Sequence, residues 1–478
     1  MIGILVIVAA LAALMYLAYR GLSLLLLTPA LAILAVLFAE QGPLLATYTQ
    51  IFMEATGGFI IQFFPLFLLG AVFGKLMEAS GSARVLADGI ILGLGSHRAI
   101  LAVILSCAVM TYGGVSLFVV AFAVWPIASA LFREAQLPRV LIPATIALGA
   151  FTFTMTALPG TPAIQNAIPM PYFGTTPFAA PGLGIITGAL MLGLGWAWLE
   201  RRARKLGPGY GEGADEGGTD GARALPSLPV AAIPLIMVLV LNIVFTFVII
   251  PQMDTAYLAL PEFGATDVGA VRGVWSVIAA LTFASLLLIA LNWRRLAGGP
   301  GERREGERQE GAGQEGAGLG VTLDAGAKDS LKPIFNTACL VGFGAVIASL
   351  AAFGAIRDWV VTVGGDNPLI SLAVGTSLLA GMTGSASGGM SIALSTLGET
   401  YLAMGEAAGI SPELLHRVTA VATGGLDALP HNGAVITLLT ICGLSHKQAY
   451  KDIAVVAVII PLIALVVLVT LGTLFGSF

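Results

Sequence analysis

Charge is scarce in this chain. Only 10% of its 478 residues are Asp, Glu, Lys or Arg, whereas about a quarter is usual in a soluble domain. With so few ionised side chains, the chain cannot cover a folded surface with groups that water solvates. This excludes an ordinary soluble enzyme and a disordered scaffold. The net charge of −4 also leaves no basic surface for a phosphate backbone, so we expect no nucleic-acid partner.

Cysteine and histidine are scarce as well, with three and four residues. Cys107, Cys339 and Cys442 each lie in an apolar run and are too scattered for a disulfide or zinc framework. We expect them to be small core side chains. The sequence has no His-Glu-x-x-His or Gly-x-Ser-x-Gly motif, which disfavours a hydrolytic enzyme. We expect no metal and no other cofactor.

What the chain does have is hydrophobic residues, 57% of the total. About 20 consecutive apolar residues cross the hydrocarbon core of a bilayer. Runs of this kind predict crossings at 3–19, 22–38, 57–74, 140–168 (interrupted), 182–199, 228–250, 272–292, 332–354, 413–443 (interrupted) and 452–476. We therefore predict an all-α polytopic membrane protein embedded in a lipid bilayer.

Lysine and arginine set the expected orientation, because they concentrate in cytoplasmic loops. Placing the basic loops inside leaves only Arg272, Arg357 and Arg417 of the 23 basic residues outside. Both termini then lie on the non-cytoplasmic side. Two glycine-rich segments of mixed charge, 200–227 and 293–331, indicate flexible cytoplasmic linkers. The alternative for these segments is a regulatory or partner-binding role.

Three short matches suggest an internal repeat. Residues 70–72 recur as 344–346, 110–111 as 382–383, and 157–159 as 428–430, at offsets of 274, 272 and 271 residues. The crossing that ends at Lys75 runs inward, whereas its counterpart begins beside Lys332 and runs outward. We therefore expect two inverted copies, an architecture of secondary transporters whose substrate site lies between the copies at the midplane.

The stretch 99–131 is predicted to be a re-entrant helical hairpin. Its flanks, Arg98 and Arg133, both fall on the cytoplasmic side, and its centre at 111–116 is rich in glycine. The arms on either side are too short to cross about 30 Å comfortably. Irregular backbone at this depth is tolerated where protein or a watery cavity satisfies it.

The stretch 369–405 is predicted to be the matching hairpin from the opposite side. Asp366 and Glu406 flank it, and its tip lies at 384–389. For either hairpin the alternative is one long kinked crossing, which would disturb the charge distribution of the loops that follow.

An interrupted crossing follows each hairpin. Two prolines that bracket a glycine break the first, within 157–166, and a glycine pair with a proline breaks the second, within 424–433. Broken helices expose N–H groups and positive helix ends, which favour an anion. We expect four such ends, two tips and two breaks, to converge on a carboxylate without any intramembrane lysine or arginine.

Polar and glycine residues at these four places are the candidate substrate-binding groups. They are Thr111, Tyr112, Gly113, Gly114, Ser116, Gly160, Thr161, Asn166, Ser385, Ser387, His431 and Asn432. The alternative for the hydroxyls and amides is a hydrogen bond between helices or a cap on a broken end. Tyr112 would either donate its hydroxyl to the ligand or fill space.

Asp427 is the one acidic residue expected deep in the membrane, and His431 follows four positions later. Ionisable residues at this depth suggest a proton relay or an ion site, and histidine titrates near physiological pH. We expect this pair to couple a proton to substrate binding. The alternative is that Asp427 caps the broken helix and holds the His431 ring. The other histidines, His97, His416 and His446, are expected at membrane boundaries and solvated.

The stretches 111–118, 157–171 and 426–438 resemble the gluconate:proton symporter (GntP) family, and within it the 3-hydroxybutyrate permease branch. The resemblance extends over nearly the whole chain apart from the glycine-rich linkers. It implies proton-coupled uptake of small hydroxy-carboxylates across a bacterial inner membrane. It also implies a wider clan of ion transporters with paired hairpins, homodimers and elevator motion.

The chain departs from its wider relatives at two places. Citrate and dicarboxylate carriers bind sodium through Ser-Asn-Thr signatures at the hairpin tips, whereas the tips here read Tyr-Gly-Gly (112–114) and Ser-Ala-Ser (385–387). Sodium sites are therefore not carried over. Gluconate carriers have a His-rich first break, whereas residues 158–161 read Leu-Pro-Gly-Thr. This difference favours a smaller, less polar hydroxy acid.

The predicted function is symport of a proton with a short hydroxy-monocarboxylate, with 3-hydroxybutyrate as the expected substrate. Residues 57–199 and 332–478 would form the moving transport region. Residues 1–56 and 228–292, expected to lack glycine-rich breaks and polar interior residues, would form a dimerising scaffold. The alternatives are a gluconate or other sugar-acid symporter, a sodium-coupled carboxylate transporter and, more remotely, an intramembrane enzyme or an anion channel.

Overall fold

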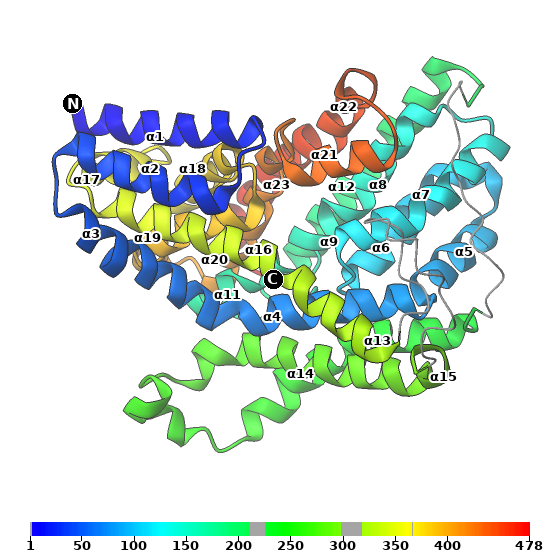
Figure 1. The fold of residues 1–478 in the computed structure, drawn as a ribbon, viewed down its shortest axis with the longest axis horizontal. Coiled ribbons are helices and arrows are strands. Elements are labelled where there is room, and N and C mark those ends of the chain that lie inside the picture. Colours follow the sequence, from blue (N-terminus) through cyan, green and yellow to red (C-terminus); the bar gives the residue numbers. More distant parts are fainter. Residues whose placement is uncertain (1, 211–224, 298–317, 366) are drawn as a thin grey trace, which may run out of the picture.

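The computed structural model describes residues 2–210, 225–297, 318–365 and 367–478. Throughout these ranges the chain forms helices and their connections, without a strand (Figure 1). Residues 211–224 and 298–317 of the two predicted linkers lie outside the described residues. So does Asp366, one flank of the second predicted hairpin.

The helices of the first half of the chain lie within residues 2–210. They are α1 (Ile2–Tyr19), α2 (Leu24–Ala39), α3 (Leu44–Ala46), the π-helical η1 (Thr47–Phe52), α4 (Met53–Ala79), α5 (Ser82–Leu94), η2 (Ser96–Arg98), α6 (Ala99–Tyr112), α7 (Leu117–Glu134), η3 (Arg139–Leu141), α8 (Ile142–Ala150), α9 (Phe153–Thr156), α10 (Ile164–Ala167), α11 (Pro169–Phe173) and α12 (Pro181–Leu206).

The helices of the second half follow that gap. They are α13 (Leu228–Val244), η4 (Phe245–Ile249), η5 (Ile250–Gln252), η6 (Ala256–Ala259), η7 (Pro261–Phe263), α14 (Val268–Leu291), α15 (Trp293–Leu296), α16 (Leu319–Ser349), α17 (Phe353–Thr362), α18 (Pro368–Thr383), α19 (Ala386–Ala407), α20 (Pro412–Thr423), η8 (Leu426–Ala428), α21 (Gly433–Ile441), α22 (His446–Ala454), η9 (Val455–Ile459) and α23 (Ile460–Phe475).

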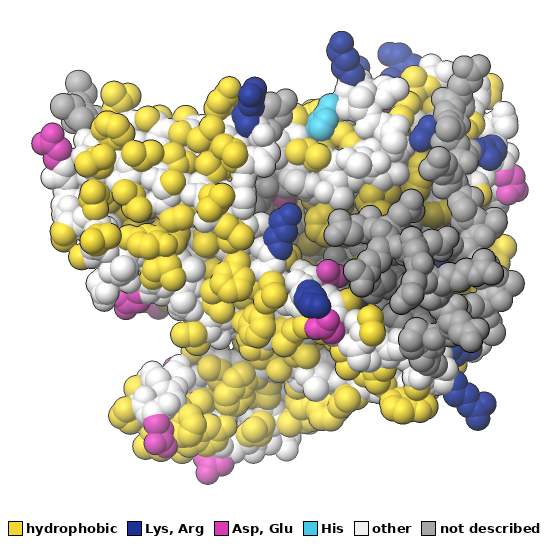
Figure 2. Space-filling model, viewed as in Figure 1, with side chains coloured by type: hydrophobic (Ala, Val, Ile, Leu, Met, Phe, Trp, Pro, Cys, Tyr) yellow, Lys and Arg dark blue, Asp and Glu magenta, His cyan; other side chains and the backbone are white. Residues whose placement is uncertain are grey.

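Eight helical stretches among the described residues are long and apolar enough to cross a bilayer. The number rises to nine if α5 and α6, bent by 101° at Gly95, form one crossing. Large apolar side chains such as Ile61, Leu92 and Val466 are exposed on these helices. Figure 2 shows hydrophobic side chains over much of the lobes of α1–α2 and α13–α14. Apolar surface of this extent is stable in lipid. The chain is a multi-pass membrane protein.

The long helices α4 and α16 pack against each other at the centre of the molecule (Figure 1). A Cβ added to Gly326 would lie 2.8 Å from the Cα of Val72, whereas a Cβ added to Gly342 would lie 2.3 Å from the hydroxyl of Thr56. Residue numbers rise along one helix as they fall along the other. The two helices are therefore antiparallel, and the glycines allow their close approach.

Helix α16 begins at Leu319, inside the segment predicted to be a linker. Lys328 pairs with Asp324 one turn earlier at 2.6 Å, and Lys75 of α4 lies 3.8 Å from the carboxylate of Asp329. Charged pairs at this spacing support an exposed helix end, and packing on α4 adds to it. Residues 319–331 are therefore helix, which corrects the prediction there.

Two pairs of helices are joined by tight turns where the sequence predicts hairpin tips. Helices α6 and α7 meet at residues 113–116, and α18 and α19 meet at 384–385. Both pairs pack helix against helix. A Cβ added to Gly389 would lie 2.3 Å from the backbone of Ala380. The second pair therefore folds back on itself in close contact, unlike the alternative of one long kinked crossing.

Two helical segments are interrupted after these pairs. In the first, α9 ends at Thr156 and α10 begins at Ile164, so 157–163 are not helical. In the second, α20 ends at Thr423 and α21 begins at Gly433, with only the short η8 between them. Pro159, Pro162 and Pro430 lie in these interruptions, where proline removes a backbone donor.

The segment 228–292, which contains α13, η4 and α14, differs from the expected scaffold without polar interior residues. Asn242, Thr246 and Ser276 are each 0% exposed. The Nδ2 group of Asn242 donates to the carbonyl of Gly160 at 3.1 Å, and its Oδ1 accepts from Thr246. A buried amide is stable because it is hydrogen-bonded. The interior of this helix pair therefore carries a polar contact to the first break.

The three cysteines are free and buried, which confirms the prediction that they are core side chains.

Candidate functional site

The first hairpin tip packs against the first break. Tyr112, at the end of α6, donates its hydroxyl to the carbonyl of Pro159 at 2.5 Å. Gly114 has φ +94°, and a Cβ there would lie 3.0 Å from Pro162. A Cβ at Gly113 would lie only 2.1 Å from Leu235 of α13. The glycines are required because the tip turns sharply against neighbours on two sides.

Two other candidates at this tip have different surroundings. The hydroxyl of Thr111 is buried and has no hydrogen-bond partner among the described residues. Ser116 lies beside α4, where a Cβ added to Gly74 would be 3.3 Å from its backbone nitrogen. An unpartnered buried hydroxyl is costly in an apolar environment, so Thr111 is the residue at this tip with spare hydrogen-bonding capacity.

The first break is held by its own backbone and by Asn166. Gly160 has φ +81°, and its N–H donates to the carbonyl of Pro177 at 2.8 Å. The Nδ2 of Asn166 donates to the carbonyls of Thr161 (3.0 Å) and Pro177 (2.9 Å). The Thr161 hydroxyl accepts from the N–H of Ala163. These bonds replace the helical ones that the prolines remove.

Arg417 overturns the expectation of a site without lysine or arginine. Its side chain, expected outside the membrane, is 0% exposed, and four of its five N–H groups donate hydrogen bonds, two at the edges of the first break and two to Ala179 in the turn before α12. Nε and Nη2 donate to the carbonyl of Ala179 (3.1 and 2.7 Å), while Nη1 donates to the carbonyl of Thr156 (3.0 Å) and to Oδ1 of Asn166 (3.1 Å). No carboxylate in the described ranges forms an ion pair with it.

His416 is also buried, which corrects the prediction of a solvated histidine. It is 0% exposed, with Nδ1 2.6 Å from the hydroxyl of Thr175 and Nε2 3.2 Å from Oδ1 of Asn166. The amide of Asn166 therefore makes four hydrogen bonds. A full set of four leaves this amide no capacity for a ligand.

Sequence reasoning missed His416 and Arg417 because it assigned each charged residue to a membrane side from its position in the chain alone. Helix α20 is buried on every side from Leu414 to Thr423, although the exposed Glu413 lies only one turn from Arg417. The one available signal was that apolar residues surround the His-Arg pair, as at Leu415 and Val418. A charged residue flanked by apolar residues on one helix is buried when other helices surround that helix on all sides.

The second hairpin tip packs against the end of the second break. Nε2 of His431 lies 3.0 Å from the carbonyl of Gly381. Nδ2 of Asn432 donates to the carbonyl of Gly384 at 2.9 Å, while its Oδ1 caps α21 by accepting from Ala434 and Val435. Asn432 thus stabilises both the tip and the restarted helix.

Ser385 and Ser387 form the remaining part of this tip. The Ser385 hydroxyl caps α19 by accepting from the N–H of Gly388 at 3.1 Å. The Ser387 hydroxyl lies 3.2 Å from that of Thr337 on α16. Both serines are half-buried, so this tip is more accessible than Thr161 and Asn166 of the first break.

Asp427 is half-buried, and its Oδ1 atom is buried without a hydrogen-bond partner among the described residues. His431 bonds to the hairpin backbone, so the contact of the alternative interpretation, in which Asp427 holds the His431 ring, is not formed. The carbonyls of Ala428 and Pro430 accept from Tyr450 and His446. Asp427 therefore has spare capacity to bind a proton or a donor.

Helix α20 connects the two breaks. Its Arg417 binds the first break, and a Cβ added to Gly424 at the start of the second break would lie 3.0 Å from Thr156. The hydrogen bonds and close contacts described above join each hairpin tip to the break that follows it. The contacts form two tip–break pairs linked through α20, and the convergence of all four ends on one carboxylate stays a prediction.

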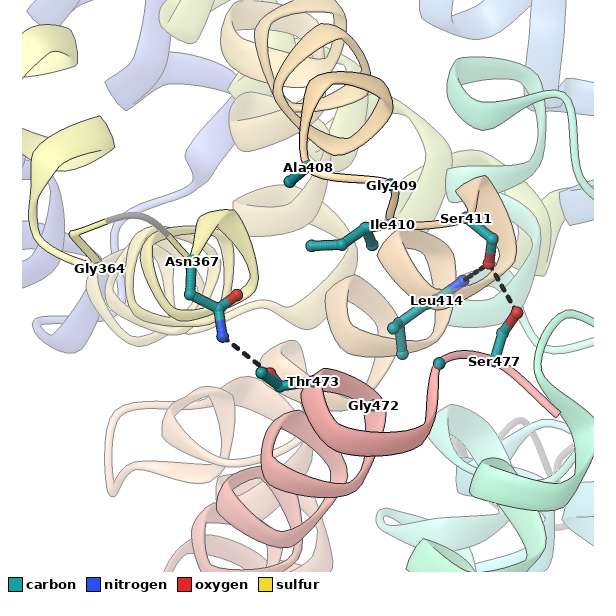
Figure 3. A pocket seen from close by; sticks show the side chains of 11 residues that line it. Gly364, Asn367, Ala408, Gly409, Ile410, Ser411, Leu414, Gly472, Thr473 and Ser477 are labelled. Carbon is teal, nitrogen blue, oxygen red and sulfur yellow. Dashed lines mark hydrogen bonds between the residues drawn. The ribbon is translucent and has the colours of Figure 1, made fainter.

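A cavity of about 580 Å³ lies elsewhere, at the opposite end of α18 from its tip (Figure 3). Asn367 and Ser411, which cap α18 and α20, line it together with Thr473 and Ser477, to which they are hydrogen-bonded. The 16 residues of α18 separate it from the tip by about 24 Å. This cavity is not the candidate site.

Comparison with known proteins gives one close sequence relative. The chain is 42% identical over 471 residues to the uncharacterized transporter YxjC of Bacillus subtilis (strain 168), and the match covers 95% of both proteins. The chain belongs to the YxjC transporter family. No protein-family model matches it.

The fold of this YxjC-family chain is similar to that of the YdaH transporter of Alcanivorax borkumensis, whose crystal structure shows an unusual topology. The TM-score is 0.52 with 16% sequence identity, and the match covers 91% of this chain and 89% of YdaH. At this identity the likeness concerns the fold alone.

Proposed function

We propose that this chain is a secondary active transporter that moves a short hydroxy-monocarboxylate together with a proton, with 3-hydroxybutyrate as the expected substrate. The observation that carries the proposal is Arg417, a buried cation without a carboxylate partner in the described ranges. A buried charge is unfavourable unless it is paired. A transported carboxylate would supply the opposite charge.

The two tip–break pairs support a transporter over the alternatives. Interrupted helices near the middle of a bundle provide free backbone groups and helix ends for an anion. The resemblance to the 3-hydroxybutyrate permease branch supplies the expected size of the ligand. The hydroxyls proposed to orient its hydroxyl group are those of Thr111, which has no partner in the described ranges, and of the half-buried Ser385 and Ser387.

We further propose the division of the chain made from the sequence: transport region 57–199 and 332–478, scaffold 1–56 and 228–292, two inverted copies, and a homodimer in a bacterial inner membrane. The antiparallel packing of α4 on α16 supports inversion, because these helices are the expected first crossings of the two transport segments.

Counterflow in proteoliposomes tests this function. Purified protein is reconstituted, loaded with unlabelled acid and given labelled 3-hydroxybutyrate, with gluconate, lactate and succinate as competitors. We expect exchange that protein-free liposomes lack, with stronger competition by short monocarboxylates than by gluconate. Absence of exchange for every acid would refute the proposal.

The coupling ion is tested separately. Replacing sodium with choline at fixed pH should leave concentrative uptake unchanged, whereas an inside-alkaline pH gradient should drive it. Since one proton and one monocarboxylate move without net charge, about one pH unit should sustain about a tenfold accumulation. If uptake requires sodium, the coupling ion is sodium and not the proton.

A further inference from the structure

The buried His416 has hydrogen-bond partners suited to both of its protonation states. In the neutral ring, Nε2–H donates to Oδ1 of Asn166 and Nδ1 accepts from the hydroxyl of Thr175. In the protonated ring, Nδ1–H donates to the same hydroxyl oxygen after that group rotates. The ring therefore keeps both partners when a proton binds, and only the hydrogen of the Thr175 hydroxyl turns away from it.

The charge nearest to His416 in the sequence is the guanidinium of Arg417. Both side chains bond to the same atom, Oδ1 of Asn166. Adding a second positive charge there is unfavourable in a buried site. An anion bound beside the pair would reverse this balance, because it would attract both cations.

The elements packed against α20 supply no buried carboxylate near this histidine. Helices α9, α10, α18 and α23 carry no titratable side chain. Helix α11 contributes Tyr172, and α19 contributes Tyr401 and the exposed Glu399 and Glu406. On α20 itself, Glu413 is exposed.

We propose that His416 takes up the co-transported proton, and that the bound carboxylate favours this step by offsetting the second positive charge beside Arg417. The inference rests on the proposed proton-coupled transport. Binding of proton and anion is then mutually favourable, since coupling between two sites is reciprocal. Asn166 transmits the state of the ring to the first break, because its amide also holds Thr161 and Pro177.

The test separates exchange from coupling. His416→Gln keeps a donor for Asn166 and an acceptor for Thr175 but cannot take a proton. We expect this variant to retain counterflow and to lose the accumulation of about tenfold that one pH unit drives. A pH dye inside the vesicles should show wild-type protein, but not the variant, carrying protons with the substrate. His97→Gln, an exposed histidine on η2, is the matched control and should behave as wild type.

Two further variants decide between candidate proton sites. His431→Gln and Asp427→Asn remove the pair expected from the sequence. Whatever each change does to the rate of exchange, the number of protons carried per substrate should equal that of the wild type. The inference would be overturned if either variant lost proton movement with the substrate while His416→Gln kept it. If the wild-type protein shows no counterflow at all, the proposed function has failed rather than this assignment.

Thr175→Val provides a second measurement if His416→Gln does not fold. This change removes the oxygen that accepts a hydrogen bond from the protonated ring. The protonated ring loses a stronger hydrogen bond than the neutral ring does, because its donor is charged. We expect the midpoint of pH-driven uptake to move to lower pH by roughly half a unit, because a charged donor forms the stronger bond. An unchanged midpoint would overturn the inference.

Discussion

Arg417 combines complete burial with a coordination made of neutral oxygens. Three backbone and side-chain oxygens surround its guanidinium, contributed by Thr156 and Asn166 at the edges of the first break and by Ala179 before α12. Such a set lowers the cost of burial without cancelling the positive charge. At the scale of the residue, this is the reason to expect an anionic cargo.

Replacing Arg417 with lysine tests whether charge alone is sufficient. Lysine keeps the charge but has a single nitrogen. It therefore cannot make the four hydrogen bonds that the planar guanidinium donates from three nitrogens. We expect Arg417→Lys to weaken substrate binding in counterflow by about tenfold or more, or about 1.4 kcal/mol, and Arg417→Gln to abolish it.

The matched control for this prediction is Arg357→Gln, since Arg357 is half-exposed and pairs with its neighbour Asp358. Exchange by this control should equal that of the wild type. Wild-type affinity in Arg417→Lys would contradict the role given to the guanidinium geometry.

At the scale of the element, glycine packing decides how closely the second hairpin can fold back. A side chain at Gly389 would collide with the backbone of Ala380 at 2.3 Å. We expect Gly389→Ala to lower the melting temperature in detergent, because overpacking of this kind costs about 1–3 kcal/mol. Gly193→Ala in α12, where nothing lies within 4 Å, should leave it unchanged or raise it slightly.

Equal melting temperatures for the two glycine variants would mean that α18 and α19 pack more loosely than described. A fall in both would indicate a general sensitivity of helical glycines rather than a close hairpin contact.

The turns and breaks were predictable because their causes are local. Glycine and proline at 113–114, 159–162 and 430 stop helices wherever they lie, and the turns follow them. The burial of α20 was not predictable, since it requires helices α9, α10 and α11 from the first half of the chain as well as its neighbours α18 and α19. The short α5 and α17 were also missed, because a search for crossings ignores helices of their length.

At the scale of the whole molecule, sidedness follows from charge. On the face in Figure 2, basic side chains lie mainly toward the α5–α7 end, and acidic ones are prominent at the opposite end. We expect Glu40→Cys to react with a membrane-impermeant maleimide in intact cells, and Arg201→Cys to react only after permeabilisation.

The native cysteines make this labelling experiment direct, since Cys107, Cys339 and Cys442 are buried and should give little background. The unsubstituted protein is the control. Labelling of Arg201→Cys in intact cells would show that the orientation is the opposite of the one expected, with both termini in the cytoplasm.

The hydrogen bond from Asn242 to the first break has a consequence for the speed of movement. It joins α13 of the proposed scaffold to the carbonyl of Gly160 in the proposed transport region, and both groups are buried. Movement of one region past the other must break this bond, which leaves a buried donor and acceptor unpaired at a cost of about 1–3 kcal/mol each. If the two regions move as proposed, this cost belongs to the barrier of every crossing, with or without bound substrate.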